Sequence, residues 1–94
     1  MPYMLIRHKV QDYDRWKSAF DDHAPMRQAA GSKGGYLFRS ADNPNEIVLI
    51  MEMEDLERAR QFVGSDDLRQ AMEGAGVTGP PEIRFLELAD RPSV

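Results

Sequence analysis

The sequence contains no cysteine, which excludes disulfides, thiolate catalysis and thiolate metal sites. It also lacks any block of lysine or arginine, because 12 basic residues are dispersed among 16 acidic ones and the formal net charge is -4. This balance argues against a nucleic-acid partner, whose phosphates attract a basic surface. Apolar runs long enough for a membrane-spanning helix or a signal peptide are missing as well. We therefore expect a soluble cytoplasmic protein with no membrane partner.

The length of 94 residues predicts a single domain, residues 1–94, with a loose tail at 89–94. The longest apolar stretch lies at residues 47–51, just after a run of turn formers at 42–45. Such a stretch indicates a strand in the middle of a sheet, covered on both faces. One layer of helices covers only one face of a sheet. The stretch therefore predicts a homodimer that forms through the open sheet face.

The N-terminal half begins with an alternating strand at residues 3–10, in which His8 shares a face with Met4, Ile6 and Val10. A stripe of residues spaced three or four apart follows, which is the pattern of a helix. Asp12 is a suitable N-cap for this helix, and Pro25 predicts a kink or a restart within it. The members of the stripe are Tyr13, Trp16, Phe20, His23 and Arg27.

A hairpin is expected around the turn formers at 42–45. With a four-residue loop, Phe38 lies opposite Leu49 and Tyr36 lies opposite Met51, which puts these two aromatic side chains on one face with the apolar core. A slip of one residue would exchange the two faces. The expected strands are residues 36–41 and 46–54.

The C-terminal half predicts a second helix that begins after Asp55 and is broken at Gly64, with Ser65 capping a further turn. We expect a loop at residues 74–81, which two prolines stiffen, and a last strand at residues 83–88. The resulting order is βαββαβ, the split βαβ pattern. It predicts an α+β, ferredoxin-like fold in which a four-stranded antiparallel sheet carries two helical segments on one face.

With this order of elements the chain resembles the dimeric α+β barrel superfamily, and within it the small antibiotic-biosynthesis-monooxygenase-like proteins. The resemblance implies that two sheets pack face to face in a homodimeric barrel. It also implies activities that range from cofactor-independent oxygenation of aromatic polyketides to small isomerisations, so we expect no cofactor. The haem-degrading branch does not fit, because the second helix lacks its Trp and His. The segments that carry the resemblance are DYDRWKSAFDDH, RSADNPNEIVLIMEMED and SDDLRQAM.

His23 is the candidate catalytic base, because it lies on the apolar stripe between a pocket-forming Phe20 and the irregularity at Pro25. The alternative is a histidine at the edge of the core, satisfied by a backbone carbonyl. His8 can point into the same layer and assist. No carboxylate stands at a metal-ligand spacing from either histidine, so no metal site is expected.

Arg27 is the candidate anion clamp, which would hold a carboxylate or phenolate at the mouth of a pocket. The alternative is a stem that packs on the helix with its charged head in water. The flat and apolar side chains nearby could line a slot for a planar aromatic ligand, or they could simply be core. The candidate substrate-binding residues besides Arg27 are Trp16, Phe20, Tyr36, Phe38 and Met51.

These residues leave three function hypotheses open. The first is a cofactor-independent monooxygenase or isomerase/cyclase that acts on an aromatic or polyketide-like small molecule. The second is a non-catalytic small-molecule-binding or stress-response dimer with the same pocket. The third is a structural dimer with no pocket, which a cavity beside His23 would contradict.

Overall fold

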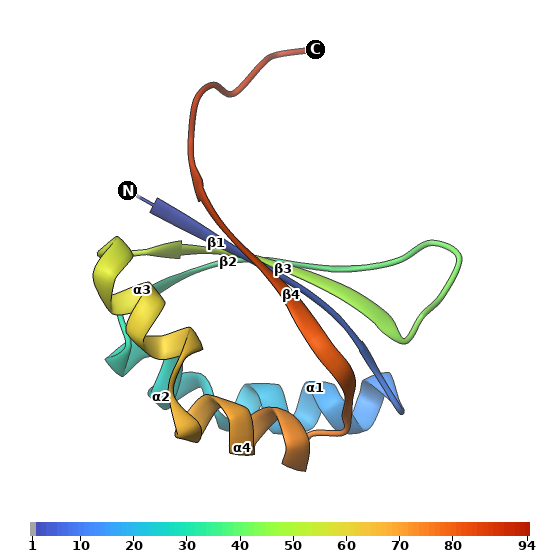
Figure 1. Cartoon of the computed structure of the whole chain (residues 1–94). Helices are drawn as coiled ribbons and strands as arrows, with labels where there is room; N and C mark the ends of the chain where they lie inside the picture. The colour runs from blue at the N-terminus through green and yellow to red at the C-terminus, as the bar shows by residue number, and fades with distance from the viewer. Residues whose placement is uncertain (1) are drawn as a thin grey trace.

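The computed structural model describes residues 2–94, which form one antiparallel sheet with all of their helices on one side of it (Figure 1). Along the described chain no helix is both long enough and apolar enough to cross a membrane. The elements are β1 (Pro2–Val10), α1 (Tyr13–Asp22), α2 (Ala24–Ala29), β2 (Ser32–Arg39), β3 (Glu46–Met53), α3 (Leu56–Val63), α4 (Asp66–Gly74) and β4 (Val77–Glu87).

The sheet has the strand order β2-β3-β1-β4, and each neighbouring pair is antiparallel. This confirms the predicted α+β, ferredoxin-like fold with four strands and helices on one face. The apolar stretch predicted to be central forms β3, one of the two inner strands. Its residues alternate between fully buried on the helix side and half-buried on the other side. The helices therefore cover one face of β3, and its other face lies on the open side of the sheet.

The core lies between the sheet and the helices. On β1 the side chains of Met4, Ile6 and His8 point toward the helices, as the alternation predicted. On β3 the same side carries Ile47 and Met53, which are almost completely inaccessible to solvent. Burial of these side chains is the main stabilising contribution available to a domain of this size.

The first helical segment is interrupted where Pro25 predicted it. Asp12 caps α1 by accepting a hydrogen bond from the backbone N–H of Arg15. The helix ends at Asp22, and His23 forms the joint to α2, in whose first turn Pro25 lies. A proline is tolerated in a first turn because its missing N–H would have no helical partner there. The break therefore leaves the His23 side chain at a bend between two short helices.

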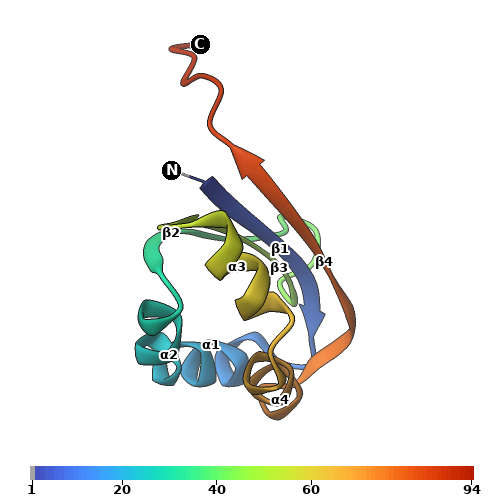
Figure 2. The ribbon, with the colours of Figure 1, turned by 60° about the vertical axis from the view of Figure 1, so that its left-hand side comes forward.

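The second helical segment is also broken as predicted. The Asp55 carboxylate accepts a hydrogen bond from the backbone of Glu57 at the start of α3, and the Ser65 hydroxyl caps α4 by accepting from Leu68. Gly64 separates the two helices. Each break lets the chain change direction between two short helices, as Figure 2 shows for α3 and α4.

The predicted register of the hairpin is wrong by one residue. Leu37 lies opposite Leu49, so Phe38 is opposite Val48 and Tyr36 is opposite Ile50. The reason is the loop, in which Ser40, and not Ala41, donates its backbone N–H to the carbonyl of Glu46. The extra loop residue turns both aromatic side chains to the open face of the sheet. There they remain exposed, by 67% for Tyr36 and 51% for Phe38.

The predicted loop at 74–81 is wrong over most of its length, because β4 begins at Val77 and includes Pro80 and Pro81. β4 is an edge strand, where a proline does not remove a hydrogen bond that a neighbouring strand needs. The pairing of β4 with β1 shifts between Arg7 and Lys9, so an irregularity accommodates the prolines. The residues after β4 are exposed and extend away from the sheet (Figures 1 and 2).

Candidate functional site

A small hollow, which we call the inner cavity, lies between the sheet and the helices. Its volume is about 60 Å³, and its walls come from β1, β3 and each of the four helices. The polar side chains at its border include His8, His23 and Arg27, and Trp16 lies beside them. A cavity beside His23 contradicts the hypothesis of a structural dimer with no pocket.

His23 borders the inner cavity from the joint between α1 and α2. Its Nδ1 lies 2.7 Å from the carbonyl oxygen of Ala19. A carbonyl can only accept, so Nδ1 carries the proton that it donates, and in the neutral ring Nε2 keeps a lone pair. The alternative, a histidine satisfied by a backbone carbonyl, therefore describes the Nδ1 side of the ring. The same contact orients the ring and leaves Nε2 as a basic nitrogen, so the two readings of His23 are compatible.

His8 borders the same cavity from β1, with only 6% of its surface exposed. Its ring meets Trp16 edge-on at 5.7 Å between centroids. The buried Nδ1 atom has no hydrogen-bond partner among residues 2–94. Burial lowers the pKa of His8 from 6.5 to about 4, so the ring is neutral at neutral pH. His8 is therefore suited to hydrogen bonding and not to carrying positive charge.

Arg27 packs on the end of α1 across the helix break. Its Nη1 donates to the carbonyl of Phe20 at 2.6 Å, and its guanidinium lies 3.5 Å from the centroid of the Phe20 ring. Burial lowers the pKa of Arg27, and the nearby Asp21 opposes that shift. The contacts with Phe20 use one face and one N–H of the guanidinium. Its remaining N–H groups can bind an anionic oxygen.

A second hollow, which we call the outer cleft, opens between α2 and the start of β2. It has a volume of about 540 Å³ and lies within the ~300–1,000 Å³ range of small-molecule sites. Four residues border both hollows, and we call them the mouth. They are Phe20, Arg27, Leu49 and Met51. The outer cleft is therefore large enough for a ring system, and the mouth residues form a wall that it shares with the inner cavity.

Two glycines shape the wall of the outer cleft. Gly34 has a φ of 93°, a left-handed conformation that favours glycine, and the pairing of β2 with β3 shifts between Ser32 and Gly35. A Cβ at Gly35 would overlap the backbone carbonyl of Ile50. The irregular start of β2 therefore depends on these glycines. The Gly-Gly pair in the sequence was the available signal for this part of the site, which sequence reasoning missed.

The other predicted binding residues are divided by the sheet. Trp16 and Phe20 stack with their centroids 4.9 Å apart, and with Met51 they lie on the helix side at the inner cavity. Tyr36 contributes to the rim of the outer cleft, although its side chain belongs to the open face. Phe38 stacks on Tyr36 on that open face, so the prediction that it lines the same pocket as His23 is wrong. The cause is the hairpin register.

A metal site was not expected from the sequence. Within residues 2–94, no group of three or more His, Cys, Asp or Glu side chains is close enough together to hold a metal ion. The site that the structure assembles consists of two histidines, one arginine and an apolar lining.

Proteins of known structure share this fold at low sequence identity. A candidate antibiotic biosynthesis monooxygenase from Bordetella bronchiseptica matches with a TM-score of 0.77 at 19% identity, over 94% of this chain and 96% of that chain. SnoaB, a cofactor-independent oxygenase from Streptomyces nogalater, matches with a TM-score of 0.76 at 18% identity, over 99% and 97%. No protein-family model matches the sequence, and no curated protein is significantly similar to it. The fold of this chain is that of the antibiotic-biosynthesis-monooxygenase-like proteins, as the resemblance in its sequence predicted.

Proposed function

We propose that the protein is a cofactor-independent monooxygenase that acts on an aromatic or polyketide-like small molecule. The observation that carries this proposal is the position of His23 at the border of an apolar cavity, with Nδ1 bonded to the Ala19 carbonyl so that Nε2 is the basic nitrogen of the neutral ring. The cavity adjoins a cleft of the size that small-molecule ligands need. The shared fold with a cofactor-independent oxygenase supports the same reaction class.

The chemistry requires a base, an anion-stabilising group and a substrate that supplies the electrons. His23 Nε2 removes a proton from an activated C–H group, and the Ala19 carbonyl stabilises the imidazolium through Nδ1–H. Arg27 binds the enolate oxygen on which the negative charge develops. The resulting carbanion reacts with O₂. For an anthrone, the CH₂ carbon ends as a carbonyl with one oxygen atom of O₂, and the other oxygen atom leaves as water. The substrate is oxidised and O₂ is reduced, so no further reductant is consumed.

The same proton removal without O₂ would give isomerisation or cyclisation, which belongs to the same proposal as its oxygen-independent form. Binding without turnover is the second candidate. The size of the inner cavity favours it, since about 60 Å³ does not admit an aromatic ring to both histidines. Only the enzymatic candidate predicts that a product forms, and it predicts that the rate of product formation depends on His23.

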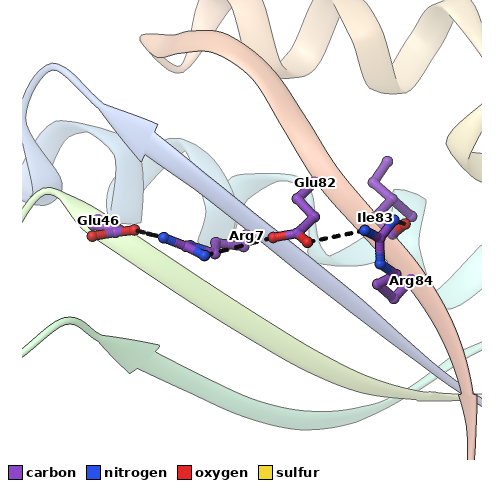
Figure 3. Close-up of polar contacts among 5 residues, drawn as sticks. All are labelled: Arg7, Glu46, Glu82, Ile83 and Arg84. Carbon is purple, nitrogen blue, oxygen red and sulfur yellow. Dashed lines mark hydrogen bonds and ion pairs between the residues drawn. The ribbon is translucent and has the colours of Figure 1, made fainter.

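We also propose that the protein acts as a homodimer through the open sheet face. This face carries a contiguous set of exposed or half-buried apolar side chains, which is unusual for a surface that stays in water. Four of its charged residues contact one another: Arg7 lies between Glu46, at 2.8 Å, and Glu82, which also contacts Arg84 (Figure 3). Burial of this network leaves none of these four charges isolated. The apolar set is Tyr3, Leu5, Tyr36, Phe38, Val48, Ile50 and Leu86.

Oxygen uptake with 1,8-dihydroxyanthrone tests the enzymatic proposal. Protein dialysed against a chelator should consume O₂ above the protein-free rate, and His23→Ala should lower the turnover rate by about 10²-fold, the range for loss of a general base. His23→Ala should fold normally, because the Ala19 carbonyl keeps its bond from the backbone N–H of residue 23. Lys17→Ala, on the helix that ends just before His23, is the matched control. Equal rates for His23→Ala and the wild type would refute the role of His23.

A further inference from the structure

The open face of the sheet and the rim of the outer cleft meet at the edge that β2 forms. We propose that in the homodimer the end of the partner's β4, with the residues that follow it, lies across β2 and forms a wall of the outer cleft. The inference rests on the proposed homodimer and specifies how its two copies fit together. Each outer cleft is then built from two chains and is incomplete in one.

The side chains of the open face form levels that run across the sheet, and the pairing of the strands defines them. Aligned packing of two identical sheets about a twofold axis allows two arrangements. An axis along the strands keeps every level opposite itself and places β4 over the partner's β2. An axis across the strands inverts the levels and places each strand over its own copy. In the order β4, β1, β3, β2 the levels are Leu86, Tyr3, Glu52 and Gly34; Arg84, Leu5, Ile50 and Tyr36; Glu82, Arg7, Val48 and Phe38; and, on β1 and β3, Lys9 and Glu46.

The charges of the open face favour the arrangement that keeps the levels. Within residues 2–94, Lys9 and Glu52 form no ion pair. With inverted levels Glu52 faces the partner's Glu46, and like charges that face each other across an interface are destabilising. With the levels kept, Lys9 faces the partner's Glu46, and Glu52 faces the partner's Tyr3, whose hydroxyl can donate a hydrogen bond. Each of these carboxylates then meets a donor.

The shapes of the two sheet edges also fit when the levels are kept. Gly34 is exposed, and an added Cβ would meet no atom within 4 Å, so β2 presents a gap at this level. Leu86 belongs to the same level on β4 and is 40% exposed. With β4 over the partner's β2, Leu86 fills the gap at the partner's Gly34. One level further, Arg84 lies over the ring of the partner's Tyr36, which is a cation–π arrangement.

The residues after β4 point to the side from which the second copy approaches. Figure 1 shows them on the side of the sheet opposite to the helices. Leu88 is 52% exposed there and continues the alternation of Leu86, so it lies one level beyond it. On the partner this is the level of Glu54, whose carboxylate lies 3.8 Å from Lys33 Nζ, and both of these residues line the outer cleft. Leu88 therefore closes the partner's outer cleft on its open side.

Cross-linking between engineered cysteines tests this arrangement, because the sequence has no cysteine of its own. Packed sheets lie ~10 Å apart, which is too far for a disulfide, so a short bismaleimide is the reagent. Tyr36→Cys and Arg84→Cys are treated alone and after the two proteins are unfolded and refolded together, and linked chains are identified by their mass. We expect a link between the two different chains in the mixture and no link in either variant alone, because β2 and β4 lie ~14 Å apart across the sheet.

A second mixture, of Leu88→Cys and Lys33→Cys, tests the wall of the outer cleft and should also link different chains. Lys17→Cys, on the helix side of the sheet, is the control that should link with neither variant. All of the substituted side chains on the sheet and on the segment after it are exposed in one chain, so these variants should fold.

Links within Tyr36→Cys alone and within Arg84→Cys alone, with none between different chains, would indicate inverted levels and overturn the inference. Absence of the link between Leu88→Cys and Lys33→Cys would overturn it as well. A wild type that is monomeric in light scattering refutes the homodimer itself. A dimer with the wrong links refutes only the arrangement proposed here.

Discussion

The burial of His8 predicts a specific loss of stability in acid. Its pKa is 6.5 in an exposed setting and about 4 in the folded protein, because burial disfavours the charged ring. Between these two values the unfolded chain binds a proton that the folded protein does not. The free energy of unfolding therefore falls as the pH drops from 6.5 toward 4, and it is fully retained above 6.5.

The magnitude follows from the size of the shift. A difference of about 2.5 pKa units, at 1.36 kcal/mol for each unit, corresponds to about 3 kcal/mol of stability lost by pH 4. Burial of the ring is the cause of this shift. A loss of this size is a large fraction of the stability of a small domain.

The assay is urea unfolding of the wild type and His8→Phe at several pH values and one protein concentration, followed by the fluorescence of Trp16. Carboxylates also titrate in this range, but they are common to both proteins and cancel in the difference. The stability of the wild type should fall more steeply than that of His8→Phe, by about 3 kcal/mol between pH 6.5 and pH 4. Parallel curves would refute the claim that His8 is buried in its neutral form.

Three further predictions follow from the surfaces and contacts described above. Light scattering should give about twice the chain mass of 10.7 kDa, and Phe38→Glu should shift the mass toward the monomer; a monomeric wild type would contradict the dimer. Arg27→Ala removes a charged hydrogen bond to Phe20 and should lower the unfolding free energy by roughly 1.5–3 kcal/mol in denaturant titrations, an effect that Arg27→Lys should partly restore. Gly35→Ala should lower stability by about 1–3 kcal/mol in thermal melts, whereas Gly74→Ala, whose added Cβ meets no atom within 4 Å, should not.

The helices were predictable because their signals are local. Asp12 and Asp55 have the side chains that cap a helix, and Pro25 disfavours helix at the residue before it, so each boundary depends on a few neighbouring residues. The antiparallel four-stranded sheet followed from the βαββαβ pattern, which leaves few arrangements of the chain. Burial of Ile47 and its neighbours then determined which strands are central.

The register of the hairpin was not predictable in the same way. It depends on one backbone hydrogen bond, from Ser40 to Glu46, and both possible registers give an alternating strand. The start of β4 was missed because Pro80 and Pro81 indicate a loop unless the strand is known to be an edge. In both cases the deciding fact is how the segment pairs with the strand beside it.

The candidate site was predictable in the part that depends on single elements. The alternation of β1 put His8 on the inner face, and the helical stripe put His23 and Arg27 beside it. The unpaired Nδ1 of His8 and the mouth between the two hollows arise only when several elements pack together. The outer cleft required the irregular start of β2 at Gly34, whose geometry depends on its pairing with β3.

The most direct test of the central claim is the fate of the oxygen atoms. Protein freed of metals would be incubated with 1,8-dihydroxyanthrone under ¹⁸O₂, and the mass of the quinone product would be measured. We predict one ¹⁸O atom in each product molecule, formed about 10²-fold more slowly by His23→Ala than by the wild type. Product that contains only oxygen from water, or equal rates of labelling for both proteins, would contradict a monooxygenase that uses His23 as its base.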